Sequence, residues 1–522
     1  MKNKNGFLIL DFGSQVTMLI ARRLRELGYY SEIKAFNEPI EKIREFNPDG
    51  IILSGGPNSV YDAGSPKRDV RELLQIAPVL GICYGMQLLA QQLGGRVDRG
   101  DTREYGLTEI TWDAAVHQRL KFPWPQQHRI WMSHGDIVTA EPLGAEVFLR
   151  SSHHMAGFIG EQMSGGRYMA LQYHPEVSHS EYGTEFLSYF AQWSGAVPNW
   201  KSEHILKEAQ KFILNTVGSQ DHVLCALSGG VDSSVVATLL TKTLGADRVH
   251  CVFVNNGLLR YQEFETVMKS YQDFGLNVVG VDAEKLFLDR LVGVVDPEKK
   301  RKIIGQLFIE VFEATLQNQL KAYRDLIRFL AQGTLYPDVI ESVSSIGGSV
   351  TIKSHHNVGG LPEKMKLKLV EPVRLLFKDE VRQLGRQIGL TSDFISRHPF
   401  PGPGLAIRII GDVTSEKLEI LKKADHLFIQ ALREQDLYHH IWQAFCVLLP
   451  VQTVGVQGDG RTYENVLALR AVTSVDGMTA DWYDFSPIFL RKISNLITNQ
   501  VRGVNRVVYD VTSKPPATIE WE

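Results

Sequence analysis

Two short glycine-rich loops constrain the fold of this 522-residue chain more than any other feature. One reads Gly-Ile-Cys-Tyr-Gly at residues 81–85, and the other reads Ser-Gly-Gly-Val-Asp-Ser at residues 228–233. Each loop follows a short apolar run and precedes a stretch with helical spacing, which indicates a strand-to-helix turn. Strands that alternate with amphipathic helices favour parallel sheets. We therefore predict an α/β protein whose two loops have different chemistries.

The first loop has the pattern of a nucleophile elbow that carries Cys83. Residues 77–82 are apolar and predict a buried strand, and residues 86–93 have the spacing of a helix. A nucleophile on such a turn is exposed at the edge of the sheet, and the positive end of a helix dipole favours a thiolate. The alternative is a buried structural cysteine, which is the commoner role of a lone cysteine.

Candidate partners for Cys83 occur elsewhere in the first 200 residues. His174 and Glu176, in the stretch Leu-Gln-Tyr-His-Pro-Glu-Val, could supply a base and the group that orients it. A second glycine turn, Ser-Gly-Gly-Pro at residues 54–57, follows an apolar strand, and its backbone amides could form an oxyanion hole. For His134 we expect a hydrogen-bonded structural role.

These three motifs, in this order and spacing, resemble the class I glutamine amidotransferases over roughly residues 6–192. That family hydrolyses glutamine through a cysteine thioester and releases ammonia. The resemblance implies that Cys83 is the nucleophile, His174 the base and Glu176 its orienting group. It also implies that the amides of Gly56 and Tyr84 form the oxyanion hole.

The second loop has the character of a phosphate cradle. It follows an apolar strand candidate at residues 223–227 and precedes a helical pattern from Ser234. Small residues let backbone N–H groups surround a phosphate at a helix N-terminus. The loop lacks the Gly-Lys-Ser/Thr ending of a Walker motif, and an ordinary turn is the alternative.

This loop resembles the pyrophosphate loop of the N-type ATP pyrophosphatases, which cleave ATP to AMP and pyrophosphate. The resemblance implies that Asp232 helps to bind Mg²⁺ with ATP. Lys353, further along, could neutralise pyrophosphate, and Asp338 or Glu341 could hold Mg²⁺ or ribose; solvated surface charges are the alternative. The expected ATP-binding residues are Ser228, Gly229, Gly230, Val231, Asp232, Ser233, Ser234 and Lys353.

Segments in the last part of the chain point to a more specific family. Residues 400–405 are too rich in proline and glycine for a helix or a central strand, and the tail reads Lys-Pro-Pro-Ala-Thr-Ile-Glu-Trp-Glu. A tail of this composition usually frays. With the stretches at 301–305 and 457–463, these segments resemble the glutamine-hydrolysing GMP synthase family over essentially the whole chain.

The resemblance implies a specific activity. Such enzymes adenylate the 2-oxygen of xanthosine 5'-phosphate (XMP), and ammonia then displaces AMP to give GMP. The implied XMP-binding residues are Arg301, Gln457, Lys514 and Glu520. A homodimer formed through the C-terminal domain is also implied, with Mg²⁺ accompanying ATP and no prosthetic group. Asn255 departs from the family, whose members commonly have Asp there.

We predict two parallel-sheet α/β domains and a small α+β domain. The expected amidotransferase domain spans residues 1–195, the ATP pyrophosphatase domain, which is adenine-nucleotide α-hydrolase-like, spans 203–397, and the C-terminal XMP-binding and dimerisation domain spans 398–522. The net charge of −3 offers no bulk attraction for nucleic acid. The four cysteines form no CxxC pair, and no apolar run suits a signal or a membrane span, so we expect a cytoplasmic protein.

Two rival functions fit parts of the sequence. Another amidotransferase ligase of the ATP-pyrophosphatase type, such as an NAD or asparagine synthetase, would differ in its amidase and would lack the Lys-Pro-Pro tail. A catalytically silent nucleotide-binding regulator would not need Cys83, His174 or Asp232.

Overall fold

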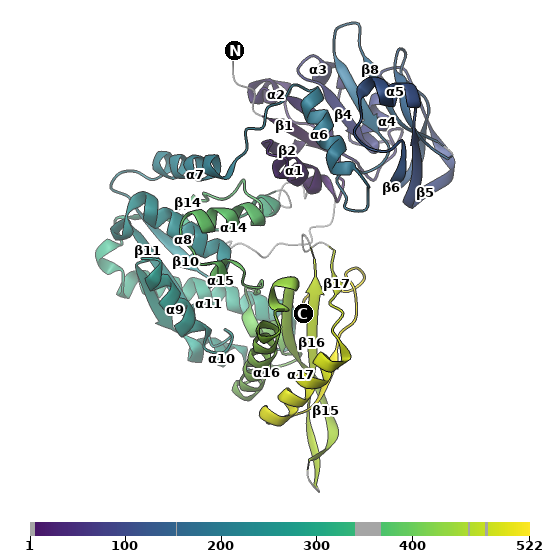
Figure 1. Ribbon diagram of the computed structural model, residues 1–522. Helices are drawn as coiled ribbons and strands as arrows, with labels where there is room; N and C mark the ends of the chain where they lie inside the picture. The colour runs from purple at the N-terminus through teal and green to yellow at the C-terminus, as the bar shows by residue number, and fades with distance from the viewer. Residues whose placement is uncertain (1–5, 153, 340–366, 458–459, 475–478) are drawn as a thin grey trace. The chain divides into compact units, whose positions relative to one another are not determined.

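The computed structural model describes residues 6–152, 154–339, 367–457, 460–474 and 479–522. The chain divides into two compact units (Figure 1). The first comprises residues 1–205 and 337–353, and the second comprises residues 206–336 and 354–522. In the described part of the chain, no helix is long and apolar enough to cross a membrane.

The first unit is built on one nine-stranded mixed sheet. Five neighbouring strands are parallel, as predicted, and the other four are antiparallel. Short links join several of the antiparallel strands, and such links cannot make the crossover that parallel pairing requires. In sheet order the strands are β2 (Ser31–Ala35), β1 (Phe7–Asp11), β3 (Gly50–Leu53), β4 (Val79–Ile82), β9 (Arg167–Leu171), β8 (Met155–Glu161), β7 (Glu146–Ser151), β5 (Arg96–Trp112) and β6 (Gln127–Ala140).

Helices connect or follow strands in both the parallel and the antiparallel parts of this sheet. The central strands β3 and β4 are buried along their whole length, so they read as continuous apolar runs in the sequence. The helices are α1 (Thr17–Glu26), α2 (Ile40–Phe46), α3 (Val70–Leu74), α4 (Tyr84–Gln92), α5 (Ala114–Leu120) and α6 (Gly183–Trp193).

The second unit begins with a five-stranded parallel sheet, as predicted. Its order is β12 (Val278–Asp282), β11 (Val249–Asn255), β10 (His222–Leu227), β13 (Ile327–Ala331) and β14 (Lys368–Val370). The neighbouring helices are α7 (Ser202–Thr216), α8 (Val231–Leu244), α9 (Glu263–Asp273), α10 (Glu284–Leu291), α11 (Pro297–Asn318), α14 (Lys378–Gln387) and α15 (Ser392–Ile395). Short 3₁₀ turns are η1 (Ala246–Arg248) and η2 (Lys321–Tyr323).

The helix after the phosphate loop begins at Val231, three residues before the predicted start at Ser234. Serine and aspartate are disfavoured in the interior of a helix but favoured in its first turn. The sequence pattern therefore predicts too late a start for this helix. Asp232 and Ser233 therefore belong to the first turn of α8.

The C-terminal elements form an α+β arrangement that shares its core with the preceding sheet. The buried cluster includes Leu224 and Leu258 together with Leu405, Phe428 and Leu467. The elements are η4 (Gly404–Arg408), α16 (Ser415–Glu434), η5 (Tyr438–His440), β15 (Gln443–Gln457), β16 (Gly460–Thr473), β17 (Asp481–Trp482), α17 (Pro487–Gln500) and β18 (Val504–Tyr509).

Candidate active sites

Cys83 occupies a strained turn between β4 and α4. Its φ is 52°, and its N–H donates to the Leu171 carbonyl over 2.7 Å. A Cβ on Gly85 would lie 2.4 Å from the Leu53 carbonyl oxygen, so this position requires glycine. Positive φ at a non-glycine residue is costly, and it is the geometry of a nucleophile elbow. The predicted elbow is therefore present in the structure.

His174 and Glu176 form a buried pair. His174 Nδ1 donates to Glu176 Oε1 over 2.7 Å, and Glu176 is 0% exposed. Burial alone would lower the pKa of His174, but the Glu176 charge and a hydrogen bond with Cys83 outweigh it and raise this pKa well above its ordinary value. The pair is therefore built to hold a proton on the imidazole.

The glycine turn after β3 lies against both of these groups. A Cβ on Gly55 would lie 3.0 Å from Cε1 of His174 and 3.6 Å from Cβ of Cys83. Gly56 is equally confined, since its Cβ would lie 2.6 Å from the Phe12 carbonyl oxygen. The structure thus brings the three predicted motifs together.

The predicted oxyanion donors are available. Among the described residues, no acceptor pairs with the backbone N–H of Gly56 or of Tyr84. The Gly85 N–H donates to the Ser54 carbonyl over 3.2 Å, which ties the glycine turn to the elbow. Unpaired amides beside a nucleophile are suited to a developing oxyanion.

His134 has the structural role expected of it. Its Nε2 lies 3.1 Å from Glu104 Oε2, and its Nδ1 lies 3.1 Å from the Asp136 carbonyl oxygen. Both ring nitrogens are thus occupied.

Sequence reasoning missed two glutamines at this site. Gln172 Nε2 lies 3.6 Å from Cys83 Sγ, and Gln87 Nε2 lies 3.5 Å from Gln172 Oε1. One signal was available: Gln87 follows Cys83 by four residues, which places both on one helical face.

The second loop closes around its own hydroxyl groups at the N-terminus of α8. Ser228 Oγ lies 3.1 Å from Ser233 Oγ, and the Ser234 hydroxyl donates to the Gly230 carbonyl over 2.7 Å. Gly229 has φ +77°, which only glycine adopts without strain. The loop thus has the shape of an anion cradle.

Asp232, in the first turn of α8, has one carboxylate oxygen without a partner. In the part of the chain that the structure describes, its buried Oδ1 has no hydrogen bond, while Oδ2 lies 3.7 Å from Lys378 Nζ. Arg397 Nη1 donates to the Gly229 carbonyl over 3.3 Å. A buried carboxylate oxygen without a partner is suited to a hard cation.

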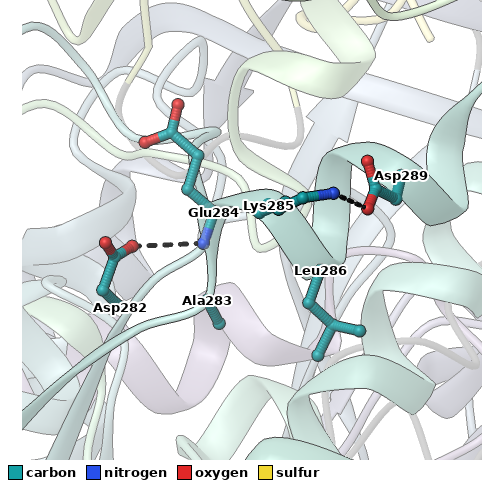
Figure 2. A pocket seen from close by; sticks show the side chains of 6 residues that line it. All are labelled: Asp282, Ala283, Glu284, Lys285, Leu286 and Asp289. Carbon is teal, nitrogen blue, oxygen red and sulfur yellow. Dashed lines mark hydrogen bonds and ion pairs between the residues drawn. The ribbon is translucent and has the colours of Figure 1, made fainter.

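A shallow pocket of about 380 Å³ lies at the end of β12 and the start of α10 (Figure 2). Asp282 Oδ1 accepts from the Glu284 N–H over 3.2 Å and from Asn255 Nδ2 over 3.2 Å. An aspartate at position 255 would instead place two carboxylates together. Asn255 therefore removes a like-charge contact at this edge of the sheet.

The C-terminal tail is anchored rather than frayed. Arg408 and Lys300, both with 0% side-chain exposure, pair with Glu520 and Glu522 respectively. Arg301 Nη2 donates to the Glu522 carbonyl over 2.6 Å. The structure thus brings Arg301 and the end of the tail together.

The other predicted nucleotide-binding residues are more scattered. Lys514 exchanges backbone hydrogen bonds with Ala480. Gln457 ends β15, opposite Gly460, at the far end of the hairpin from Gln443. At about 3.3 Å per residue, that strand separates Gln457 from Gln443 by roughly 45 Å. Lys353 and Glu341 lie outside the described residues.

Three family models match successive segments of the chain. The class-I glutamine amidotransferase model matches residues 8–193, the NAD synthase model residues 205–300, and the GMP synthase C terminal domain model residues 430–521. Among solved structures, a glutamine amido transferase from Methylobacillus flagellatus aligns with a TM-score of 0.26 and 20% identity, over 37% of this chain and 76% of that chain.

Full-length relatives are much more similar to this chain in sequence. A glutamine-hydrolysing GMP synthase from Bdellovibrio bacteriovorus is 63% identical and covers 99% of this chain and 100% of its own. That from Chlorobaculum tepidum is 52% identical, over 99% of this chain and 98% of its own, and that from Bartonella quintana is 53% identical over the same shares. These full-length matches exclude the rival ligase families, and the NAD synthase model matches residues 205–300 alone. The chain belongs to the glutamine-hydrolysing GMP synthase family of ligases.

Proposed function

We propose that this chain makes GMP from XMP, with glutamine as the nitrogen donor and ATP as the activating agent. The first unit releases ammonia from glutamine. The second transfers AMP from ATP to the 2-oxygen of XMP with loss of pyrophosphate, and ammonia then displaces AMP. The observation that carries the proposal is the combination, in one chain, of Cys83 beside the His174–Glu176 pair and a phosphate loop at the start of α8.

In the glutaminase step, Cys83 Sγ attacks the amide carbon of glutamine. The carbonyl oxygen gains the electron pair and accepts hydrogen bonds from the amides of Gly56 and Tyr84. His174, which Glu176 orients, gives its proton to the departing nitrogen, so ammonia leaves and a thioester remains. Water then hydrolyses the thioester to glutamate, and His174 recovers a proton from that water.

For the adenylation step, we propose that the loop from Ser228 to Ser234 holds the phosphates of ATP. Asp232 fits a Mg²⁺ ion, because its Oδ1 is buried without a partner in the described structure. Bound Mg²⁺ would neutralise the charge of the pyrophosphate that leaves. The loop amides and the start of α8 position the phosphates. Lys353 is proposed to add a cation on the strength of the family resemblance.

We propose that XMP binds near the tail, through Arg301, Lys514 and Glu520. An arginine and a lysine suit its phosphate, and a carboxylate suits hydrogen-bond donors on its purine. Arg301 and the tail already meet through Glu522, which supports a shared site. Gln457 ends β15, whereas Glu520 contacts Gln443 at the start of that strand, so we propose that Gln457 acts at XMP from a second copy.

A homodimer through the C-terminal domain is part of the proposal. The β15–β16 hairpin exposes several large apolar side chains, which suit a protein interface. They are Val451, Val454, Val456 and Tyr463, at 51%, 51%, 74% and 63% exposure.

A single assay tests the proposed function. Purified protein is supplied with ATP, Mg²⁺, glutamine and one acceptor at a time: XMP, or the acceptor of an NAD or asparagine synthetase. We expect AMP and GMP in equal amounts with XMP and no amidated product with the others. Amidation of a different acceptor, or no AMP with XMP, would overturn the proposal.

A further inference from the structure

Gln172 is a fully buried amide that touches the sulfur of Cys83. It follows β9 directly, is 1% exposed, and its Nε2 lies 3.6 Å from Cys83 Sγ. The preceding residue, Leu171, accepts the backbone N–H of Cys83 over 2.7 Å. The backbone contact thus holds the side chain of Gln172 in register with the nucleophile.

A second amide determines which end of Gln172 faces the sulfur. Gln87, which is 3% exposed, donates from Nε2 to the Asp136 carbonyl over 3.1 Å, and the same Nε2 lies 3.5 Å from Gln172 Oε1. A backbone carbonyl only accepts hydrogen bonds, so the NH₂ group of Gln87 must face the Asp136 carbonyl. The same NH₂ group faces Gln172, whose amide oxygen must therefore be the acceptor. The NH₂ group of Gln172 is therefore directed at Sγ. The reversed amide would oppose two NH₂ groups and aim an oxygen at the sulfur.

Besides its hydrogen bond with His174, the sulfur has two polar contacts that favour opposite protonation states. The Ser133 carbonyl, 3.7 Å from Sγ, can accept only from the neutral S–H group. The Gln172 N–H donates to sulfur and favours the thiolate, as hydrogen bonds to the charged form of an acid do. Among the described residues, the titratable groups on the elements next to Cys83 include His174 and Glu176 after β9, His134 and Asp136 on β6, and Glu104 on β5, which pairs with His134.

We propose that Gln172 is a further catalytic residue of the glutaminase, whose amide N–H stabilises the anionic sulfur of Cys83 before attack and again when the thioester breaks. The proposal rests on the proposed function, in which Cys83 is the nucleophile. The Asp136 carbonyl and Gln87 act through Gln172 and are positioning groups in this step.

The test uses two variants of the full-length protein. Gln172→Met keeps the volume and removes the donor, and Gln172→Glu keeps the shape but places an acceptor beside the sulfur. Gln192→Met is the matched control, because the Gln192 amide on α6 donates to the Ser188 hydroxyl in an exposed contact. The first readout is the pH midpoint for alkylation of Cys83 by iodoacetamide, located by peptide mass analysis.

We expect this midpoint to rise by about one pH unit in Gln172→Met and by more in Gln172→Glu, since one hydrogen bond to a charged group is worth about that shift. The kcat/KM for glutamine should fall about tenfold or more in both, while synthesis from added ammonium is unchanged. Gln192→Met should match the wild type. A midpoint equal to that of the wild type in both Gln172 variants would overturn the inference.

The same assay separates two kinds of failure. If Cys83→Ala retains glutaminase activity, the proposed nucleophile is wrong. If Cys83→Ala is inactive while the Gln172 variants behave as wild type, only the role of Gln172 is wrong. Thermal melting of each variant shows whether the first unit stays folded; a rise in midpoint in a variant with wild-type melting supports the inference.

Discussion

Arg408 holds the carboxylate of Glu520 with two hydrogen bonds, 3.2 Å from Nε and 2.8 Å from Nη2. The guanidinium is fully buried and lies 4.1 Å from the centre of the Phe445 ring. Gln443 Nε2 donates to the same carboxylate over 2.7 Å. The carboxylate proposed for purine recognition is therefore already oriented from the interior of the second unit.

The Arg408–Glu520 pair should respond unequally to loss of either partner. Glu520→Ala leaves the Arg408 guanidinium buried without its carboxylate partner, so the free energy of unfolding should fall by about 3–5 kcal/mol. Arg408→Met fills the volume and leaves Glu520 able to reach water, so the loss should be smaller. Denaturant unfolding measures both, with the exposed Arg502→Met as control. A larger loss in Arg408→Met than in Glu520→Ala would contradict this account.

Arg408→Met should also weaken XMP binding, because the tail loses its anchor. We expect KM for XMP to rise about tenfold, equivalent to about 1.4 kcal/mol. The KM for glutamine, measured as free glutaminase, should not move. Equal changes in both constants would instead point to a general folding defect.

Cys83→Ala should separate the two chemistries of the protein. Without the thiol no thioester forms, so glutamine-dependent GMP synthesis should fall by at least about 1,000-fold, or about 4 kcal/mol. Synthesis from ammonium should persist, since the phosphate loop belongs to the other unit. The measurement is the rate of GMP formation by the variant and by the wild type with glutamine and with ammonium. Turnover of glutamine by the variant would show that another residue is the nucleophile.

Asp232→Asn should suppress AMP formation with either nitrogen source. The change keeps the volume and removes the charge that would hold Mg²⁺ beside the phosphates, so we expect a loss of about 100-fold or more, or roughly 2.7 kcal/mol. Basal glutaminase should remain. Asp247→Asn, on an exposed 3₁₀ turn, is the control. Release of pyrophosphate at the wild-type rate would rule out this role.

His398 should make the second unit sensitive to acid. Burial and the nearby Arg260 and Arg433 charges outweigh its hydrogen bond to the Tyr438 carbonyl and lower its pKa to about 4. Its Nδ1 accepts the Ala444 N–H over 3.2 Å, so a proton there would break that bond. A histidine whose folded pKa is depressed stabilises the fold above about pH 6.5, and this contribution is lost as pH falls toward 4.

Titration of His398 should lower the free energy of unfolding by about 3 kcal/mol between pH 6.5 and pH 4. His398→Phe retains the stacking on Tyr438, whose ring centre lies 3.9 Å away, but cannot titrate. The variant should be less stable at pH 7, and its stability should fall less steeply between pH 6.5 and 4.5. Denaturant unfolding over this pH range measures the slope. Parallel slopes for the two proteins would show that another group is responsible.

Local patterns in the sequence suffice for the elements that carry the two loops. The strands before Cys83 and Ser228 occupy central positions in their sheets and are largely buried. A strand buried on both faces has a continuous apolar sequence, which can be recognised without knowing its neighbours. The motifs predict the roles of Cys83, His174 and Glu176, and the structure brings these residues together. The predicted start of α8 is wrong by three residues because polar first-turn residues resemble a loop in sequence.

Only the tertiary structure decided which groups face each other across the chain. Gln172 meets Cys83 across 89 positions, and Glu520 meets Arg408 across 112. No periodicity encodes such pairs, because they arise when the sheet and the tail fold back on themselves and exclude water. The direction of the Gln172 amide depends further on Gln87 and the Asp136 carbonyl. The sequence by itself determined the chemical groups and the turns that present them, while long-range packing decided their orientation, burial and protonation.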